Sequence, residues 1–293
     1  MLQTSPQPLP PSNPAKGKLS ILFFVALLLC FVVAYVPVLK SLIHTWSTSD
    51  DYSHGFFILP ISLYIAWQKK DEISHLDARP SKWGLVLFIF SLMIYFLAYS
   101  AGIRTLSSFT IIPLWAGIIL YLFGFRMVGA LMFPLFFLLF MIPVPSQIYS
   151  FLTIPLQLTV SKVSVMLTSG IGIPIFAEGN VLHLPGRTLE VVEACSGLRS
   201  LLSLFVLSIV FGYFSLRSNL LRSVLFVSAV PVAILVNIVR VSLIVVAFYY
   251  FNFDLASASM HTWLGLGIFF LALIIIFVER GILGIWDHSA NVK

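Results

Sequence analysis

Charged residues are scarce in this chain, at 10% of its 293 residues. Soluble globular domains carry roughly 25%, so the composition excludes an ordinary soluble domain. Hydrophobic residues make up 59% and fall in runs of helix length. The short alternating segments of a membrane β-barrel are also lacking. Together these features predict an all-α polytopic membrane protein.

Cysteine is nearly absent, and the chain has only Cys30 and Cys195. Cys30 lies half-way along one apolar run and Cys195 at the end of another, so their depths in a bilayer differ. A disulfide requires Cα atoms within about 7 Å, and we expect none between them. Cys30 is interpreted as a packing residue.

Several chemical motifs are missing as well. The sequence has no H-E-x-x-H zinc motif, no G-x-S-x-G serine elbow and no Walker P-loop, so those three enzyme classes have no support. Its basic residues form no stripe interleaved with aromatic residues. The net charge of +6 therefore does not indicate nucleic-acid binding. Neither a cofactor nor a bound metal is predicted.

The apolar runs predict a single transmembrane domain over residues 19–280, between a disordered cytoplasmic tail (1–18) and a short cytoplasmic tail (281–293). A chain of this length holds about eight spans of roughly 20 residues. We expect them at 19–39, 54–67, 83–100, 105–123, 127–143, 196–214, 223–249 and 262–279.

Two segments break this pattern. Residues 147–169 alternate polar and apolar side chains, which predicts an amphipathic or half-inserted helix that does not cross. Residues 174–192 are rich in β-formers on both sides of Pro185-Gly186, a turn signal, and predict a small hairpin-like extracytoplasmic cap.

The basic residues predict the orientation. If residues 147–169 do not cross, both termini share a side with the basic loops around 69–82, at Arg126 and from Arg217 to Arg222. Loops rich in Lys and Arg are cytoplasmic, so we expect both termini in the cytoplasm. A crossing at 147–169 would move Arg217 and Arg222 outside, which disfavours that alternative.

A short polar turn with a thiol directly precedes one apolar run. It contains Glu193, Cys195, Ser196, Gly197 and Arg199. The orientation puts Cys195 at the outer membrane surface. A lone cysteine in so apolar a chain is usually a packing residue, but these polar neighbours pack poorly and can activate a thiol.

Arg240 is the only charge in the span predicted at 223–249. It lies roughly 25 Å along that helix, near the outer face, at about 1.5 Å per residue. An arginine inside a membrane costs roughly 2.5–3.5 kcal/mol and marks a function by default. Asn237 lies three residues earlier on the same face and can orient the guanidinium. His261 opens the last span on the same side, although by itself it also fits an interfacial anchor.

Cys195, Arg240 and His261 are thus predicted to meet at one depth, and together they permit acyl transfer. A thiolate attacks a carbonyl, an imidazole moves protons, and a guanidinium stabilises an oxyanion or the thiolate. A second outer cluster of Asp50, Asp51 and His54 is the main rival. His54 can replace His261 as the proton-handling group, the cluster can belong to the substrate cleft, or it can bind a metal, although adjacent carboxylates more often only solvate a loop.

These residues resemble the exosortase/archaeosortase family of membrane transpeptidases. The resemblance rests on Glu193–Arg199, Asn237–Val241, His261, the Tyr52–Phe56 block and the Pro134–Pro145 run, and it covers most of the chain from residue 50 onward. It implies an active site facing the periplasm. In that site Cys195 forms an acyl-thioester, Arg240 donates a proton and His261 stabilises the transition state.

The resemblance also implies the partners and the location. Substrates are exported proteins whose C-terminal tails carry a recognition motif such as Pro-Glu-Pro, a membrane span and a basic end. The enzyme is then a multi-pass protein of the bacterial inner membrane. The alternative from another class is a transporter or an exopolysaccharide-export component that binds an anionic substrate at Arg240. An acyltransferase with a lipid thioester would share the nucleophile.

Overall fold

The structure is a computed structural model that describes residues 14–49, 51–191, 198–255 and 258–289. These residues are mostly helical, as predicted, with one small antiparallel sheet. In chain order the elements are α1 (Pro14–Thr48), α2 (Gly55–Gln68), α3 (Lys70–Ser74), α4 (Lys82–Ser100), α5 (Arg104–Phe109), α6 (Ile111–Phe123), α7 (Phe125–Ala130), α8 (Met132–Phe137), the 3-10 helix η1 (Leu138–Met141), α9 (Ser146–Gly170), β1 (Phe176–Glu178), β2 (Val181–Leu184), β3 (Arg187–Glu190), α10 (Leu198–Ser215), α11 (Asn219–Phe251) and α12 (Ala258–Ser289).

Within the described residues, five helical segments are long and apolar enough to cross a membrane. They are Lys82–Ser100, Arg104–Phe123, Ser146–Gly170, Asn219–Phe251 and Thr262–Asp287. Shorter apolar helices at Gly55–Gln68, Met132–Met141 and Leu201–Ser215 occupy three other predicted spans.

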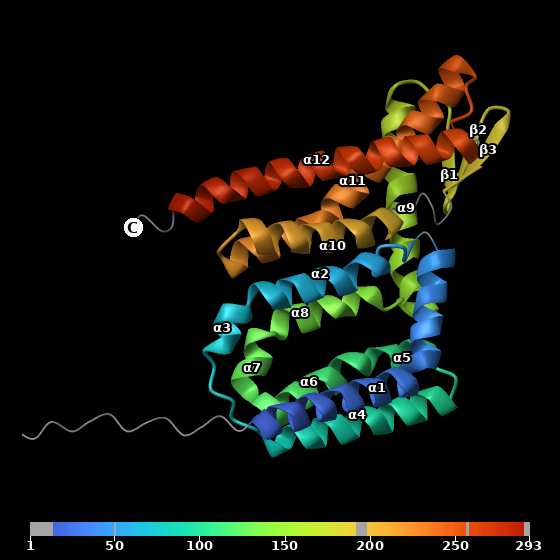
Figure 1. Ribbon diagram of the computed structural model, residues 1–293. Coiled ribbons are helices and arrows are strands. Elements are labelled where there is room, and N and C mark those ends of the chain that lie inside the picture. Colours follow the sequence, from blue (N-terminus) through green and yellow to red (C-terminus); the bar gives the residue numbers. More distant parts are fainter. Residues whose placement is uncertain (1–13, 50, 192–197, 256–257, 290–293) are drawn as a thin grey trace, which may run out of the picture.

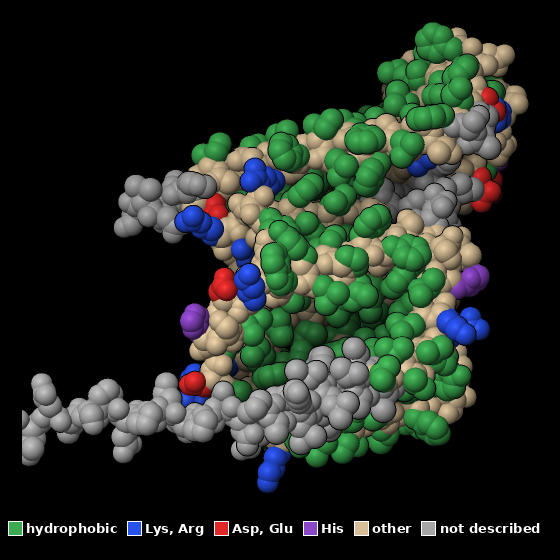
Figure 2. Space-filling view, in the orientation of Figure 1, with side chains coloured by type: hydrophobic (Ala, Val, Ile, Leu, Met, Phe, Trp, Pro, Cys, Tyr) green, Lys and Arg blue, Asp and Glu red, His purple; other side chains and the backbone are tan. Residues whose placement is uncertain are grey.

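The outside of the molecule is covered by large hydrophobic side chains, as a lipid environment requires. Trp83, Phe96 and Phe277 are 69%, 67% and 60% exposed. In Figure 2 hydrophobic side chains cover the flanks, and charged side chains gather mainly toward the two ends of the helices. This distribution matches a protein whose helices lie along the membrane normal.

Helix α9 differs from the prediction in the environment of its polar face. Its length and composition allow a span, yet Figure 1 shows it running across the direction shared by α2, α4, α10 and α12. The sequence predicted an amphipathic helix, whose polar face normally meets water. Instead one set of its polar side chains is buried in protein, at positions Thr153, Gln157, Ser161, Ser164 and Thr168. The residues spaced three or four apart form one face, and α9 packs against α11.

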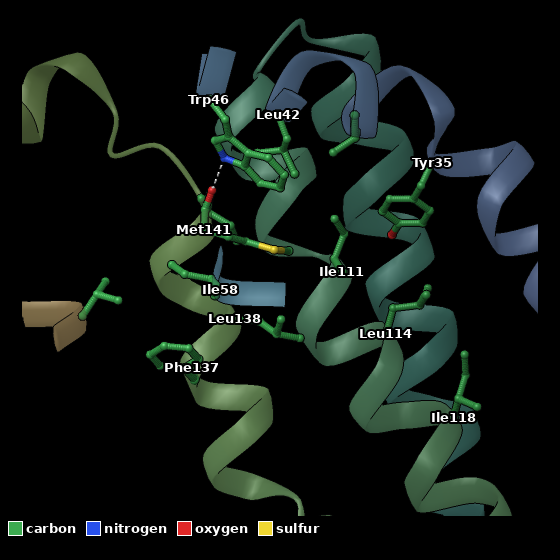
Figure 3. Packing of buried hydrophobic residues seen from close by; sticks show 13 residues of the cluster. Tyr35, Leu42, Trp46, Ile58, Ile111, Leu114, Ile118, Phe137, Leu138 and Met141 are labelled. Carbon is green, nitrogen blue, oxygen red and sulfur yellow. Dashed lines mark hydrogen bonds between the residues drawn. The ribbon is translucent and has the colours of Figure 1, made fainter. Parts of the chain in front are cut away.

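The N-terminal half is held by a core between α1, α2, α6 and η1 (Figure 3). Trp46, near the end of α1, donates an indole N–H bond of 2.8 Å to the carbonyl oxygen of Met141. The indole also lies over Gly55, because a Cβ at that position would overlap its ring atoms. These contacts fix the C-terminal end of α1 against the start of α2 and the end of η1.

In the region of the predicted hairpin-like cap, the structure has three antiparallel strands in the order β1-β2-β3. Pro185 and Gly186 form the turn between β2 and β3, as expected, and Gly186 has the positive φ of 77° that glycine accommodates. Arg187 of β3 pairs with Asp254 after α11 at 2.6 Å, and the Tyr250 hydroxyl donates to the carbonyl of Ile171 at 3.0 Å. The sheet is therefore attached to the end of α11.

Two helices extend beyond the predicted spans. α1 begins at Pro14, so residues 14–18 are helical and not part of the tail. α12 continues to Ser289 through most of the expected C-terminal tail. Near its end the buried carboxylate of Asp287 accepts hydrogen bonds from the backbone N–H groups of Arg217 (2.6 Å) and Ser218 (3.1 Å). These groups lie in the connection directly before α11, whose N-cap is Ser218.

Candidate active site

The turn that carries the predicted nucleophile lies outside the described residues. It includes Glu193, Cys195, Ser196 and Gly197, and the described chain resumes at Leu198 with α10. Before this turn, the backbone N–H of Val191 donates a hydrogen bond of 2.8 Å to the carbonyl oxygen of Asn180. The chain is therefore attached to the sheet as far as Val191. The turn thus connects the cap to the start of α10. Arg199 lies in the first turn of that helix.

Arg240 of α11 reaches across to α12. A Cβ built at Gly265 would lie 3.2 Å from Nη2, 3.6 Å from Cζ and 3.8 Å from Nη1 of Arg240. The guanidinium therefore rests on the glycine, and its Nε atom is buried. A larger residue at position 265 would displace it.

His261 lies in the first turns of α12, four residues before Gly265. Residues four apart lie on one face of a helix. The guanidinium of Arg240 is therefore beside the face of α12 that includes position 261. Whether the thiol joins these two residues stays a prediction, because Cys195 is not among the described residues.

Asn237 is buried on α11, one turn before Arg240, and only 3% of it is exposed. At this level α9 contributes its polar face: the Ser164 hydroxyl donates to the Ile238 carbonyl at 3.4 Å. Ser161, one turn earlier on α9, is fully buried. This polar lining was not predicted from the sequence, although its spacing of three and four residues along α9 was the available signal.

The rival cluster around His54 makes structural contacts. His54 lies in the turn before α2, where its Nε2 is 3.2 Å from the Phe140 carbonyl oxygen, so the Nε2–H tautomer donates a hydrogen bond. Burial lowers the pKa of His54 from its usual value, although the bond to Phe140 partly opposes this shift. A carboxylate oxygen of Asp51 accepts a hydrogen bond of 2.9 Å from the Tyr149 hydroxyl.

These contacts attach the start of α2 to η1 and the residues before it to α9. Tyr52 takes part as well, since its hydroxyl accepts the backbone N–H of Val144 at 3.2 Å. Asp51 contacts α9 and His54 contacts η1, and Asp50 lies outside the described residues. Within the described part of the chain, no group of three His, Cys, Asp or Glu residues is placed to hold a metal ion. Arg240 and the face of α12 that includes position 261 stay the predicted centre of the site.

Comparison with known proteins gives the family of the chain. The chain matches the family model of the transmembrane exosortases (EpsH type) over residues 46–278, a range that includes Cys195, Arg240 and His261. No curated protein and no solved structure matches it. The family match covers well over half of the chain and confirms the resemblance seen in the sequence. The chain therefore belongs to the transmembrane exosortase family.

Proposed function

We propose that this exosortase is a cysteine transpeptidase that cleaves the C-terminal sorting signals of exported proteins. Membership of the family implies a role in processing tails of the PEP-CTERM type. Such a tail consists of a recognition motif, one membrane span and a basic end. The apolar flanks of the enzyme suit the membrane span of such a substrate.

In the proposed reaction, the Cys195 thiolate attacks the carbonyl carbon of the scissile peptide bond. The carbon–nitrogen bond breaks, the amine of the released tail takes up a proton, and the remaining protein stays on Cys195 as a thioester. An acceptor, either water or an amine, then attacks the thioester carbon. Its proton returns to the sulfur, and the thiol is restored.

Arg240 and His261 are assigned the roles of assisting groups. Arg240 donates the proton or stabilises the negative oxygen that forms on the carbonyl, and such charge stabilisation usually contributes more to the rate of acyl transfer than any other single effect. His261 acts as the base or stabilises the transition state. Glu193, Ser196, Gly197, Arg199 and Asn237 are expected to support the site.

The contact of Arg240 with Gly265 carries this proposal. It puts a guanidinium from one apolar helix against another apolar helix, one turn from position 261. A guanidinium inside a membrane is energetically costly, and an arginine kept there usually marks a functional site. The buried polar face of α9 lines the same level, which supports a polar reaction centre between these helices.

Processing of a tagged substrate in cells tests the proposal. Cys195→Ala is expected to insert and accumulate normally but to leave the substrate tail uncut. Cys30→Ala, which removes the other thiol, is the matched control and should process normally. Normal processing by Cys195→Ala would overturn the proposal, and so would a loss with Cys30→Ala alone.

Thiol labelling tests the predicted topology. A membrane-impermeant maleimide added to the periplasmic side should label Cys195 in intact inner membranes and should not label Cys30. If the reagent labels Cys195 only from the cytoplasmic side, the predicted orientation is wrong. A transporter that binds an anion at Arg240 would retain transport in Cys195→Ala, which distinguishes the alternative class.

A further inference from the structure

A cavity of about 500 Å³ lies at the end of α1, away from Arg240. The last turns of α1 and the connection between α4 and α5 enclose it, and its lining includes Lys40, His44 and Arg104. In Figure 1 the end of α1 and α5 lie at the same end of the molecule as the sheet. Figure 2 shows a His side chain and a basic side chain exposed beside each other at this end.

The charge of this cavity is positive. Lys and Arg are cationic at neutral pH, and the described lining of the cavity contains no acidic residue. Asp51 follows α1 in the chain, but its carboxylate accepts a bond from Tyr149 of α9. The excess of Lys and Arg is expected on the cytoplasmic side. Lys40 and Arg104 are exceptions, from separate helices, and they converge on one cavity.

Contacts among α1, α4 and the start of α6 hold the helices next to the cavity together. Pro37, which lines the cavity, interrupts the hydrogen bonding of α1, and the Tyr95 hydroxyl of α4 donates at 2.6 Å to the carbonyl of Ala34 in the preceding turn. The hydroxyls of Tyr35 and Thr110 are 2.9 Å apart, which ties α1 to the start of α6. The rings of Tyr35 and Tyr95 also stack, with centroids 4.3 Å apart.

The surroundings suit an amphiphile more than a free ion. Tyr99 lines the cavity, and tyrosine is typical of the level of lipid headgroups. In the adjoining turn of α4, Phe96 and Leu97 are 67% and 60% exposed and offer an apolar surface below the cationic opening. Basic pockets between membrane helices bind the headgroups of anionic lipids.

We propose that Lys40, Arg104 and His44 form a phosphate-binding site occupied by the headgroup of an anionic phospholipid in the outer leaflet. The phosphate accepts hydrogen bonds from Lys40 and Arg104, and the acyl chains lie along the apolar surface of α4. The site is separate from the proposed thiol chemistry. It can therefore be tested in the Cys195→Ala background, where a failure of the proposed reaction has no influence.

Native mass spectrometry of the full chain, with phosphatidylglycerol or phosphatidylcholine as the probe, tests this site. Lys40→Gln and Arg104→Gln should each weaken phosphatidylglycerol binding about fivefold, since one basic side chain near an anionic lipid surface contributes about 1 kcal/mol. Lys162→Gln is the matched control. Lys162 is an exposed residue of α9 outside the cavity, so the substitution removes the same charge without a predicted effect.

The outcomes separate the sources of the phosphate. Loss of phosphatidylglycerol in Lys40→Gln but not in Lys162→Gln, with no change for phosphatidylcholine, supports the lipid site. If inorganic phosphate competes with the lipid in the wild-type chain but not in Arg104→Gln, the same residues also accept a free anion. Equal binding by the wild-type chain, Lys40→Gln and Arg104→Gln would overturn the proposal. All three substituted residues are exposed, and an unchanged Tm shows that each variant is folded.

Discussion

One added methyl group at Gly265 tests whether the position of Arg240 governs catalysis. In Gly265→Ala the new Cβ would lie 3.2 Å from Nη2 of Arg240, whereas carbon atoms in good contact are about 3.5–4.0 Å apart. The helix backbone is fixed by its hydrogen bonds, and the guanidinium is the far end of a flexible side chain. The guanidinium should therefore move, by about 0.3–0.8 Å, to restore a normal contact.

A displacement of this size has a predictable effect on rate. Misplacement of a reacting group by about 1 Å can cost about a hundredfold. On that scale, a shift of about 0.3–0.8 Å lowers the processing rate by about fourfold to fortyfold. Stability should not fall, because replacing glycine with alanine inside a helix stabilises it by about 1 kcal/mol.

The assay is the initial rate of tail cleavage from a reporter substrate, measured at equal enzyme levels. Gly267→Ala is the matched control, since a Cβ there meets no atom within 4 Å and the same helix gains the same methyl group. We expect Gly267→Ala to cleave at the wild-type rate with a similar Tm. Equal rates for Gly265→Ala and Gly267→Ala would refute the role given to Arg240.

Three further predictions concern stability. Gly55→Ala should lower the free energy of unfolding by about 1–3 kcal/mol, because the new methyl group overlaps a buried indole. Gly129→Ala is the control, since the space at its Cβ is open and the free energy of unfolding should not fall. Thermal unfolding in detergent compares the two variants, and an equal effect would contradict the proposed overlap with the indole. Because burial lowers the pKa of His54 in the folded protein, the unfolded chain takes up the proton first as pH falls below about 6.5. The free energy of unfolding should then decrease with falling pH in that window, and His54→Gln should remove this part of the slope in a pH series; an unchanged slope would count against it. A double-mutant cycle of Arg187→Gln and Asp254→Asn should give a coupling of about 0.2–1 kcal/mol, since both side chains are partly exposed, and a coupling of zero would show that the pair does not attach the sheet to α11.

The helices were predictable because lipid leaves the backbone few alternatives. A run of about 20 apolar residues must satisfy its own N–H and C=O groups, so it forms a helix. The run predicted at 83–100 is α4 (Lys82–Ser100). The environment of α9 was not predictable in the same way. A helix with a polar face has the same sequence pattern whether that face meets water or a neighbouring helix, and here it meets α11.

The candidate site was predictable in part. Arg240 could be identified because a charge in an apolar run is rare and costly. Gly265 could not be singled out, because a glycine gives no indication of what it faces until the neighbouring helix is placed. The alternative role of His54 was open in the sequence, since its partner Phe140 is 86 residues away. The position of Cys195 relative to both groups stays a prediction.

The carboxylate of Asp287 has a consequence for biosynthesis. It accepts the N–H groups of Arg217 and Ser218, which are 70 and 69 residues earlier in the chain. During translation, the connection between α10 and α11 is therefore made well before the carboxylate that binds its N–H groups. The N–H groups of this connection can bind the carboxylate of Asp287 only after the end of α12 has been synthesised. A stop codon or a fusion joined between residues 278 and 287 would leave this connection without the carboxylate, even though the whole family-matched range had been synthesised.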